Sequence, residues 1–323
     1  MSFSDTYDPT KSVLSGPGSA VSNREDLTDV LSILAPEETP VLSSASKQRA
    51  SSTFVEWTVD SLADVSTAGV SEGADVTSFT DKFSGRARLG NYTQKFRRDY
   101  MVSDLQEAVD SVGPAKIAQA EAKAIRELKR DVEATLLSDN EMSAEDGAGT
   151  PYKLRGLGKW IQNGAQTTNP VPAAFRTPTG SIKEDASTLL ESEFNDLITS
   201  IYRETGTTNS LTLVADTALR RVISDFARVG VSNENREFNV SGDSGTIRLS
   251  VELYQSDHGV VSIINMNPDC APDTTNKDTG YLINPEYFGI AELIPMGSTR
   301  LPNLGGGERG YVDCALTSLV YHP

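Results

Sequence analysis

The segment from residue 50 to residue 100 constrains the fold more than any other part of the chain. Two stretches in it, Thr53–Asp60 and Arg86–Arg98, have the β-branched and aromatic composition of strands. The residues between them are mainly Ser, Thr, Ala, Asp and Gly, which predicts a long β-hairpin with a polar tip. Each leg of about 20 residues would reach ~65 Å. An isolated two-stranded ribbon is marginal in water, so we expect its partner elsewhere, with another copy of the chain as the candidate.

The strongest helical signal follows this hairpin. Ser103 and Gln106 predict a capping box for a short helix, and Gly113-Pro114 separates it from a longer one. From Pro114 to Leu137 apolar residues recur every three or four positions, which predicts an amphipathic helix of ~36 Å. The recurring residues are Ile117, Ala122, Ile125, Leu128, Val132 and Leu136.

The N-terminal region does not form a compact unit of its own. Residues 1–22 are rich in Ser, Thr, Gly and Pro without periodicity, which predicts an extended arm. Asn23–Leu34 has the cap and the apolar spacing of a helix. Pro36 ends this helix, and residues 36–42 are expected to be extended. Such a series of short pieces normally lies on another surface.

The C-terminal half has a denser pattern of helices and strands. A capping box at Ser181 and Glu184 predicts a helix ending at Gly206, and Asp216 caps a second helix after the strand Leu211–Val214. Further strands are predicted at Leu157–Ile161, Thr246–Tyr254, Val260–Asn265, Tyr281–Ile283, Gly289–Ile294 and Tyr311–Val320. Because strands and helices do not alternate, the pattern indicates an α+β fold and not a doubly wound nucleotide-binding sheet.

No arrangement typical of a catalytic, cofactor or metal site appears in the sequence. Ser256-Asp-His-Gly259 predicts a hairpin turn, and His322 is the penultimate residue; neither histidine has a metal-ligand neighbour at i+4. Gly156-Leu-Gly-Lys-Trp160 lacks the first glycine and the hydroxyl that a phosphate loop requires. The carboxylates are dispersed, so no acid–base pair stands out. We therefore expect no enzyme, no cofactor and no metal.

The net charge of the chain limits the classes of partner that it can bind. The chain has 29 Lys and Arg against 45 Asp and Glu, a formal charge of −16 with both His neutral. Both a non-specific nucleic-acid coat and an anionic-membrane binder need a basic face, so both are disfavoured. No run of 18 apolar residues is present, and the N-terminus has no secretory pattern. Cys270 and Cys314 are expected to be reduced thiols, which fits folding in a reducing cytoplasm.

One stretch has the opposite charge to the rest of the chain. Between residues 81 and 99, six basic side chains accompany two aspartates. The basic residues are Lys82, Arg86, Arg88, Lys95, Arg97 and Arg98. A solvated strand face explains them. The alternative is that this leg docks on an acidic neighbouring subunit, where charge complementarity sets orientation and register.

The order of these segments, together with several short sequence motifs within them, resembles that of the tailed-bacteriophage major capsid protein, specifically its SU10-like branch. The resemblance runs from residue 23 to the C-terminus and is most specific over 23–137. The resemblance depends on the motifs Arg24-Glu-Asp-Leu-Thr-Asp29, Pro36-Glu-Glu-Thr-Pro40, Phe54-Val-Glu-Trp57 and Glu127-Leu-Lys-Arg-Asp-Val-Glu133.

This resemblance implies an HK97-like capsid fold. The implied parts are an N-terminal arm (1–47), an extended β-hairpin E-loop (48–100), a peripheral domain (101–184) with a spine helix (114–137), an axial domain (185–285) and a return to the peripheral domain (286–323). Under this interpretation Trp57 and the six basic residues become candidate inter-subunit contacts.

The implied function is a major capsid protein whose copies form the pentamers and hexamers of an icosahedral shell. The shell would enclose double-stranded DNA without sequence-specific binding, and would be assembled in the bacterial host cytoplasm and found in the virion. A portal protein is an implied partner, and scaffolding and decoration proteins stay open. No Lys–Asn crosslinking pair is recognisable, so we expect a shell without covalent crosslinks. The alternatives are a tail-tube or decoration subunit, and an acidic cytoplasmic enzyme with an unrecognised site.

Overall fold

The computed structural model describes residues 38–83, 85–109, 116–161, 166–206, 210–226, 252–273 and 275–323. Its largest sheet, here called the body sheet, has the strand order β1-β9-β10-β4. The bounds are β1 Ser46–Arg49, β4 Gln94–Val102, β9 Phe288–Leu301 and β10 Glu308–Val320. β10 is antiparallel to both β9 and β4, and β1 runs parallel to the start of β9. Segments far apart in the sequence therefore build one sheet.

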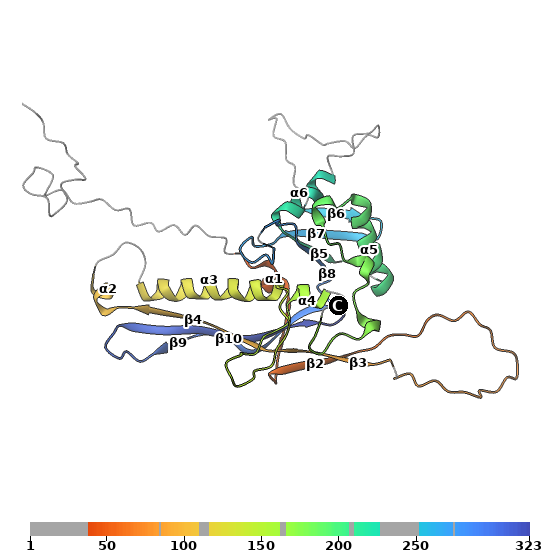
Figure 1. Cartoon of the computed structure of the whole chain (residues 1–323), viewed down its shortest axis with the longest axis horizontal. Helices are drawn as coiled ribbons and strands as arrows, with labels where there is room; N and C mark the ends of the chain where they lie inside the picture. Colours follow the sequence, from red (N-terminus) through yellow and green to blue (C-terminus); the bar gives the residue numbers. More distant parts are fainter. Residues whose placement is uncertain are drawn as a thin grey trace, which may run out of the picture.

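The predicted long helix is confirmed and covers this sheet. Helix α3, Lys116–Leu137, lies along one face of the body sheet (Figure 1). Leu128, Val132 and Leu136, spaced by four residues, are fully buried at 0 % exposure because this spacing keeps them on one side of the helix. Before it, the predicted helix start at Ser103 is also confirmed. The Ser103 hydroxyl accepts a hydrogen bond from the Gln106 amide at 3.2 Å, at the start of α2, Asp104–Ala108.

The predicted hairpin is present, but its paired part is shorter than expected. β2, Phe54–Val59, and β3, Ala87–Tyr92, form an antiparallel ribbon of six residues each. The second half of the predicted second leg is β4, which pairs with β10 in the body sheet. Residues 60–83 between the two strands contain no helix or strand and project away from the rest of the molecule (Figure 1).

A second, smaller sheet lies beyond α3. Its strand order is β6-β7-β5-β8, with bounds β5 Leu211–Ala215, β6 Leu253–Ser256, β7 Gly259–Asn265 and β8 Gly280–Ile283. Helices α5, Glu191–Thr205, and α6, Thr217–Phe226, pack on it through Phe194, Ile198 and Ile223. The turn between β6 and β7 contains His258, as predicted.

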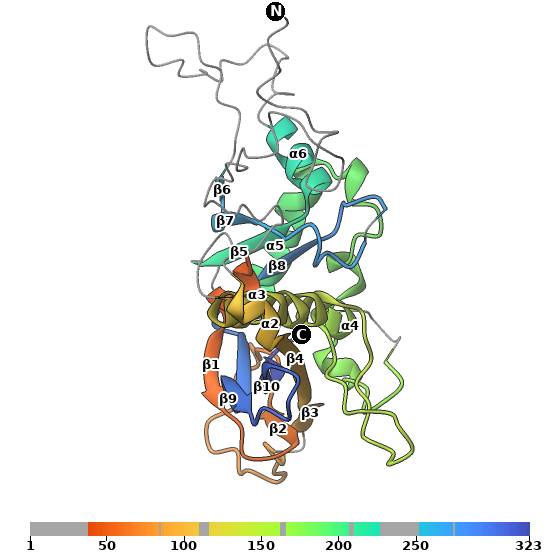
Figure 2. The same ribbon diagram turned by 90° about the vertical axis from the view of Figure 1, so that its left-hand side faces the viewer.

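The two sheets are joined through a shared core. On the small sheet, Val214 and Tyr281 pack in one cluster with Leu137 of α3, Trp160 and Val320 of β10. The Tyr281 hydroxyl donates a hydrogen bond to the carbonyl of Leu137 at 2.9 Å. Figure 2 shows the small sheet and its helices on one side of α3 and the body sheet on the other.

Several local predictions were wrong. Leu157–Ile161 is a helix, α4, and not a strand, and Pro40–Ser44 is a helix, α1, and not an extended segment. α5 begins at Glu191 and not at Ser181, although its predicted end at Gly206, with φ of 70°, is confirmed. The stretch before α5 instead forms short 3-10 turns, which are η1 Ala173–Phe175, η2 Thr179–Ser181 and η3 Ala186–Thr188.

Two predicted elements lie wholly or mainly outside the described residues. These are the helix Asn23–Leu34 and most of the strand Thr246–Tyr254. The strand predictions for 260–265, 281–283, 289–294 and 311–320 are confirmed, with β9 and β10 longer than expected.

Candidate self-association surfaces

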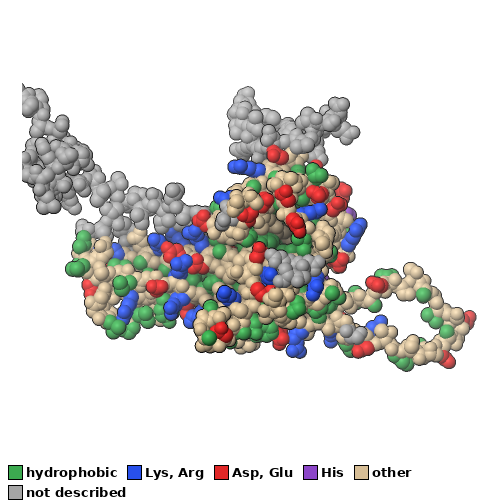
Figure 3. Space-filling model, in the orientation of Figure 1, with side chains coloured by type: hydrophobic (Ala, Val, Ile, Leu, Met, Phe, Trp, Pro, Cys, Tyr) green, Lys and Arg blue, Asp and Glu red, His purple; other side chains and the backbone are tan. Residues whose placement is uncertain are grey.

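Residues 60–83, here called the bare loop, leave large apolar side chains in water. Leu62 is 98 % exposed and Phe79 is 90 % exposed. Figure 3 shows most of the bare loop extending to the right, away from the rest of the described subunit. It carries five carboxylates and one lysine, so it is acidic overall, with apolar residues spaced along it. A side chain that folding leaves in water contributes nothing to subunit stability, which makes this loop the first candidate for contact with another molecule.

Four of the six predicted basic contact residues already have partners within the subunit. Their ion pairs are Arg86–Asp60 at 2.8 Å, Arg88–Glu56 at 3.7 Å, Lys95–Asp313 at 3.0 Å and Arg98–Asp131 at 2.6 Å. Lys82 and Arg97 are exposed and form no ion pair with another described residue. The structure therefore divides the six basic residues into two groups. Four form ion pairs that hold the ribbon and β4 in place, and the other two are available to pair with another molecule.

The seventh predicted contact, Trp57, is partly buried and packs against the subunit's own core. Its ring is 5.7 Å from the ring of Trp160 and 6.3 Å from that of Tyr321, measured between centroids. The Arg155 guanidinium stacks on the Trp160 ring, 4.7 Å from its centroid, and forms an ion pair with Glu141 at 2.7 Å. Trp57 thus anchors β2 to α4 and to the end of β10.

The sequence prediction missed a buried carboxylate that fastens the N-terminal side of the structure. Glu133 of α3 has 0 % exposure, and its two oxygens accept hydrogen bonds from the amides of Val41 at 2.9 Å and Leu42 at 2.8 Å. These amides are unpaired donors in the first turn of α1, which a carboxylate satisfies well. Burial raises the pKa of Glu133, and the two amide hydrogen bonds oppose this. A charged residue on the buried face of a predicted helix was the signal available in the sequence.

The end of the body sheet opposite the bare loop also exposes apolar side chains. Here α2 and the turn between β9 and β10 meet, as the left side of Figure 1 shows. The exposed residues are Met101, Leu105, Val109, Leu301 and Leu304. In the turn itself, Gly305 and Gly307 have φ values of 95° and 118°, which other residues rarely adopt.

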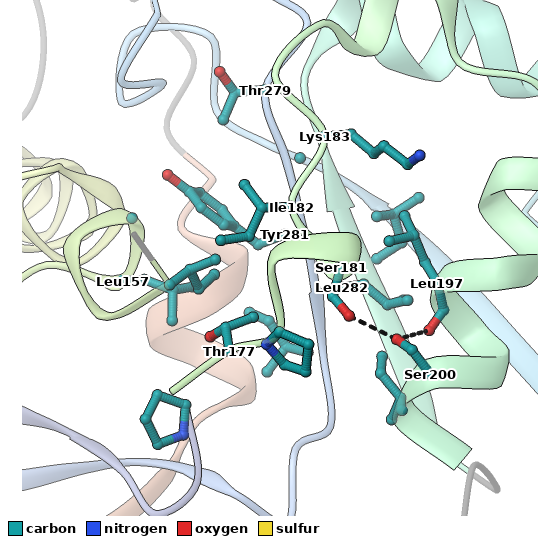
Figure 4. A pocket seen from close by; sticks show the side chains of 18 of the residues that line it. Leu157, Thr177, Ser181, Ile182, Lys183, Leu197, Ser200, Thr279, Tyr281 and Leu282 are labelled. Carbon is teal, nitrogen blue, oxygen red and sulfur yellow. Dashed lines mark hydrogen bonds between the residues drawn. The ribbon is translucent and has the colours of Figure 1, made fainter. Parts of the chain in front are cut away.

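A cavity of about 630 Å³ lies between α4, α5 and β8. Its lining mixes apolar side chains such as Leu157, Leu197 and Leu282 with hydroxyl groups (Figure 4). Ser181 and Ser200 hydrogen-bond to each other at 2.8 Å, and the Ser200 hydroxyl donates to the carbonyl of Leu197 at 2.9 Å. These hydroxyl groups are thus bonded to one another and to the backbone, which is typical of structural side chains.

The other groups considered for chemistry have structural surroundings. Cys270 and Cys314 are buried free thiols, and burial raises the pKa of Cys270 to about 11 and that of Cys314 to about 12, so both stay protonated. His258 stacks on Tyr202, and His322 packs edge-on against Phe175. Among the described residues, no cluster of three His, Cys, Asp or Glu side chains is arranged to hold a metal ion. Within the same residues, no helix has the length and hydrophobicity needed to cross a membrane.

Comparisons with known proteins agree with this architecture. The capsid of the empty GTA particle superimposes with a TM-score of 0.58 at 13 % identity, covering 96 % of this chain and 95 % of that one. The capsid of cyanophage P-SCSP1u gives 0.55 at 13 % identity over 95 % and 92 %, and Mycobacterium phage Bobi gives 0.56 at 10 % over 94 % and 91 %. At these identities the likeness establishes a shared HK97-like capsid fold. No curated protein matches the sequence.

The profile of one protein family, described as SU10 major capsid protein, matches residues 9–322. That family is described as a major capsid protein, which excludes both alternatives raised by the sequence, the enzyme and the tail-tube or decoration subunit. The match spans the β2–β3 ribbon, α3 and both sheets. The chain belongs to the SU10 major capsid protein family.

Proposed function

We propose that many copies of this chain assemble, as pentamers and hexamers, into the icosahedral head shell of a tailed phage. Family membership and the capsid structures it resembles support this proposal. The single observation in the subunit that carries it is the bare loop. An extended segment with Leu62, Val65, Val70 and Phe79 at 84 % exposure or more gains nothing in an isolated subunit, whereas burial against neighbours contributes ~25 cal/mol per Å².

The parts of the subunit have proposed roles in that shell. Residues 1–47 form an N-terminal arm, and the region 48–100 supplies an E-loop that consists of the β2–β3 ribbon and the bare loop. Residues 101–184 and 286–323 form the peripheral domain around α3, which is the spine helix. Residues 185–285, which contain the small sheet with α5 and α6, form the axial domain near the capsomer axes.

Charge complementarity supports contact between copies. The bare loop is acidic apart from Lys82 near its end, whereas Arg97 on β4 is an exposed cation without an ion pair to a described residue. The sequence suggested a basic leg docking on an acidic neighbour. The structure adds that a suitable acidic segment is present in the same chain, so one copy can offer both halves of such a contact.

The remaining partners follow from the proposed shell. A portal protein would occupy one vertex, and packaged double-stranded DNA would lie in the lumen without sequence-specific contacts, as a net charge of −16 favours. Scaffolding and decoration proteins stay open as partners. Assembly would take place in the host cytoplasm and the mature protein would be found in the virion. The shell would be held without covalent crosslinks, so purified particles boiled in SDS should give monomers, and a ladder of multimers would contradict this.

Negative-stain electron microscopy of the purified full chain tests the proposal. Uniform closed shells, or rings of five and six subunits, are expected over a range of protein and salt concentrations. A monomer under every condition tried, in expressed protein and in protein released from virions, would overturn it.

A further inference from the structure

One edge of the body sheet has a strand-sized gap. β1 pairs with β9 only from Gly289 to Glu292, and the last bond on that side runs from the Ala50 amide to the carbonyl of Glu292 at 2.9 Å. β9 continues to Leu301, and over Leu293–Leu301 its only described strand neighbour is β10, on the other side. Nine residues of extended backbone span ~30 Å, so an edge of that length is left without a neighbouring strand.

Apolar side chains along this gap are partly exposed, and a basic side chain lies near each end. Ile294 and Leu301 are 40 % and 43 % exposed. Arg49 marks the end of β1 and is exposed, without an ion pair to a described residue. Arg300 marks the far end, and its side chain is 65 % exposed although Glu121 lies 3.8 Å away. A strand that fits this edge should therefore have β-forming residues flanked by acids.

The bare loop contains such a strand. Val76-Thr-Ser-Phe-Thr80 is rich in β-branched and aromatic residues and is flanked directly by Asp75 and Asp81. In the subunit it has no strand neighbour and makes no backbone hydrogen bond to another described residue. Val76 is 71 % exposed and Phe79 is 90 % exposed. A segment with these features can exchange the water on its backbone groups for strand hydrogen bonds by adding to a sheet edge.

The spacing of the flanking charges also fits. Arg49 lies opposite Glu292, eight residues before Arg300, which corresponds to ~26 Å along the strand. Asp75 and Asp81 are six residues apart, or ~20 Å, and the length of the arginine side chains covers the difference. The bare loop and the open end of β9 lie at opposite ends of the subunit (Figure 1), so the two must come from different copies.

We infer that Val76–Thr80 of one subunit adds as a fifth strand to the Leu293–Leu301 edge of β9 in a neighbouring subunit, with Asp75 and Asp81 against Arg49 and Arg300. This inference rests on the proposed assembly and names its contact. Polypeptide of the same chain is the occupant because its charge, its length and its unpaired backbone match the gap together. The other edge strand of the body sheet, β4, provides the control position for the test of this contact.

Cysteine pairing in assembled particles tests this contact. Thr299→Cys on β9 is combined with Thr77→Cys or with Ser78→Cys, which face opposite sides of the added strand. One matched control combines Thr299→Cys with Ser66→Cys, elsewhere in the bare loop. The other combines Asp99→Cys on β4 with Thr77→Cys or with Ser78→Cys. Cys270 and Cys314 are 3 % and 1 % exposed and do not compete. Particles are assembled under reducing conditions, checked by microscopy and then mildly oxidised.

We expect one of the two Thr299→Cys pairs to give disulfide-linked subunits at least fivefold above both controls. Particles that form normally but show no such excess, or that link through Asp99→Cys, overturn the inference and leave the proposed function standing. Failure of the unsubstituted chain to form particles overturns the proposed function itself.

Charge reversal gives a second measurement in case the cysteine pairs do not assemble. Arg49→Glu with Arg300→Glu should lower particle yield at least tenfold, and adding Asp75→Arg with Asp81→Arg should restore most of it. Restoration is the result expected for either strand direction. Equal yields in the two variants would count against the contact.

Discussion

The body sheet under α3 and the bare loop belong to one chain but follow opposite rules. Leu128 of α3 has 0 % exposure, whereas Leu62 of the bare loop has 98 %. In the first region the apolar side chains pack against each other within the subunit, whereas in the second Leu62, Val65, Val70 and Phe79 stay at least 84 % exposed. Under the proposed assembly, this chain completes its hydrophobic contacts in two steps, the first on folding and the second between copies.

Deletion of residues 62–80 separates these two steps most strongly. We expect the subunit to fold with an unchanged thermal midpoint, because the deleted residues contribute nothing to its core, while closed particles fall at least tenfold. Microscopy measures the particles, and thermal unfolding followed by circular dichroism measures the fold. A normal particle yield would show that the bare loop is not an assembly element.

A matched pair of leucine substitutions sharpens the same comparison. Leu128→Ala should lower the free energy of unfolding by about 2–5 kcal/mol, since it leaves a cavity in the core under α3. Leu62→Ala should change it by less than about 0.5 kcal/mol, as for an ordinary surface position. Chemical denaturation of the dissociated subunit measures both. Similar losses in the two variants would contradict the division into a folded body and a bare loop.

Glu133 tests how the N-terminal side is held on the body. Glu133→Ala leaves the Val41 and Leu42 amides without an acceptor, and we expect a loss of about 2–3 kcal/mol. Glu133→Gln keeps one acceptor oxygen and should lose about 1 kcal/mol near neutral pH.

The stability difference between the wild type and Glu133→Gln should depend on pH with a defined sign. Burial raises the pKa of Glu133, so the folded subunit prefers the protonated form. The stability of the wild type relative to Glu133→Gln should therefore be greatest below the usual pKa of a glutamic acid and fall as pH rises through the raised value. Denaturant midpoints of both proteins between pH 4 and 8 measure the difference, and an increase with pH would contradict the assignment.

The smallest expected effect distinguishes two adjacent arginines. Arg98 makes a two-bond pair with Asp131, at 2.6 and 2.8 Å, but both side chains are more than a third exposed, so Arg98→Ala should cost only about 0.5–1 kcal/mol and less in high salt. Arg97→Ala, beside it, should leave subunit stability unchanged and lower particle yield instead. The reverse result for the two variants would place the intermolecular contact at Arg98.

Much of this fold could be predicted from the sequence because its signals are local. The apolar period of α3, the serine cap of α2, the glycine after α5 and the β-branched runs of β5, β7 and β10 depend on neighbours within one or two turns of chain. The composition of residues 60–83 also showed in advance that they lack a core of their own. These features follow from steric preferences and from spacing, which no distant residue has to supply.

Only the tertiary structure decided how these pieces pair. The capping pattern at Ser181 could not reveal that the chain makes short 3-10 turns there and begins α5 at Glu191. Nothing local marks β4 as part of the body sheet, Trp57 as a core residue, or Glu133 as the acceptor for amides 91 and 92 residues away. The physical reason is that a carboxylate, a tryptophan or a strand edge has many acceptable partners, and the choice among them depends on which surfaces folding brings together. Local spacing determined the elements of this protein, whereas long-range packing determined which of their side chains are buried within the subunit and which stay exposed on its surface.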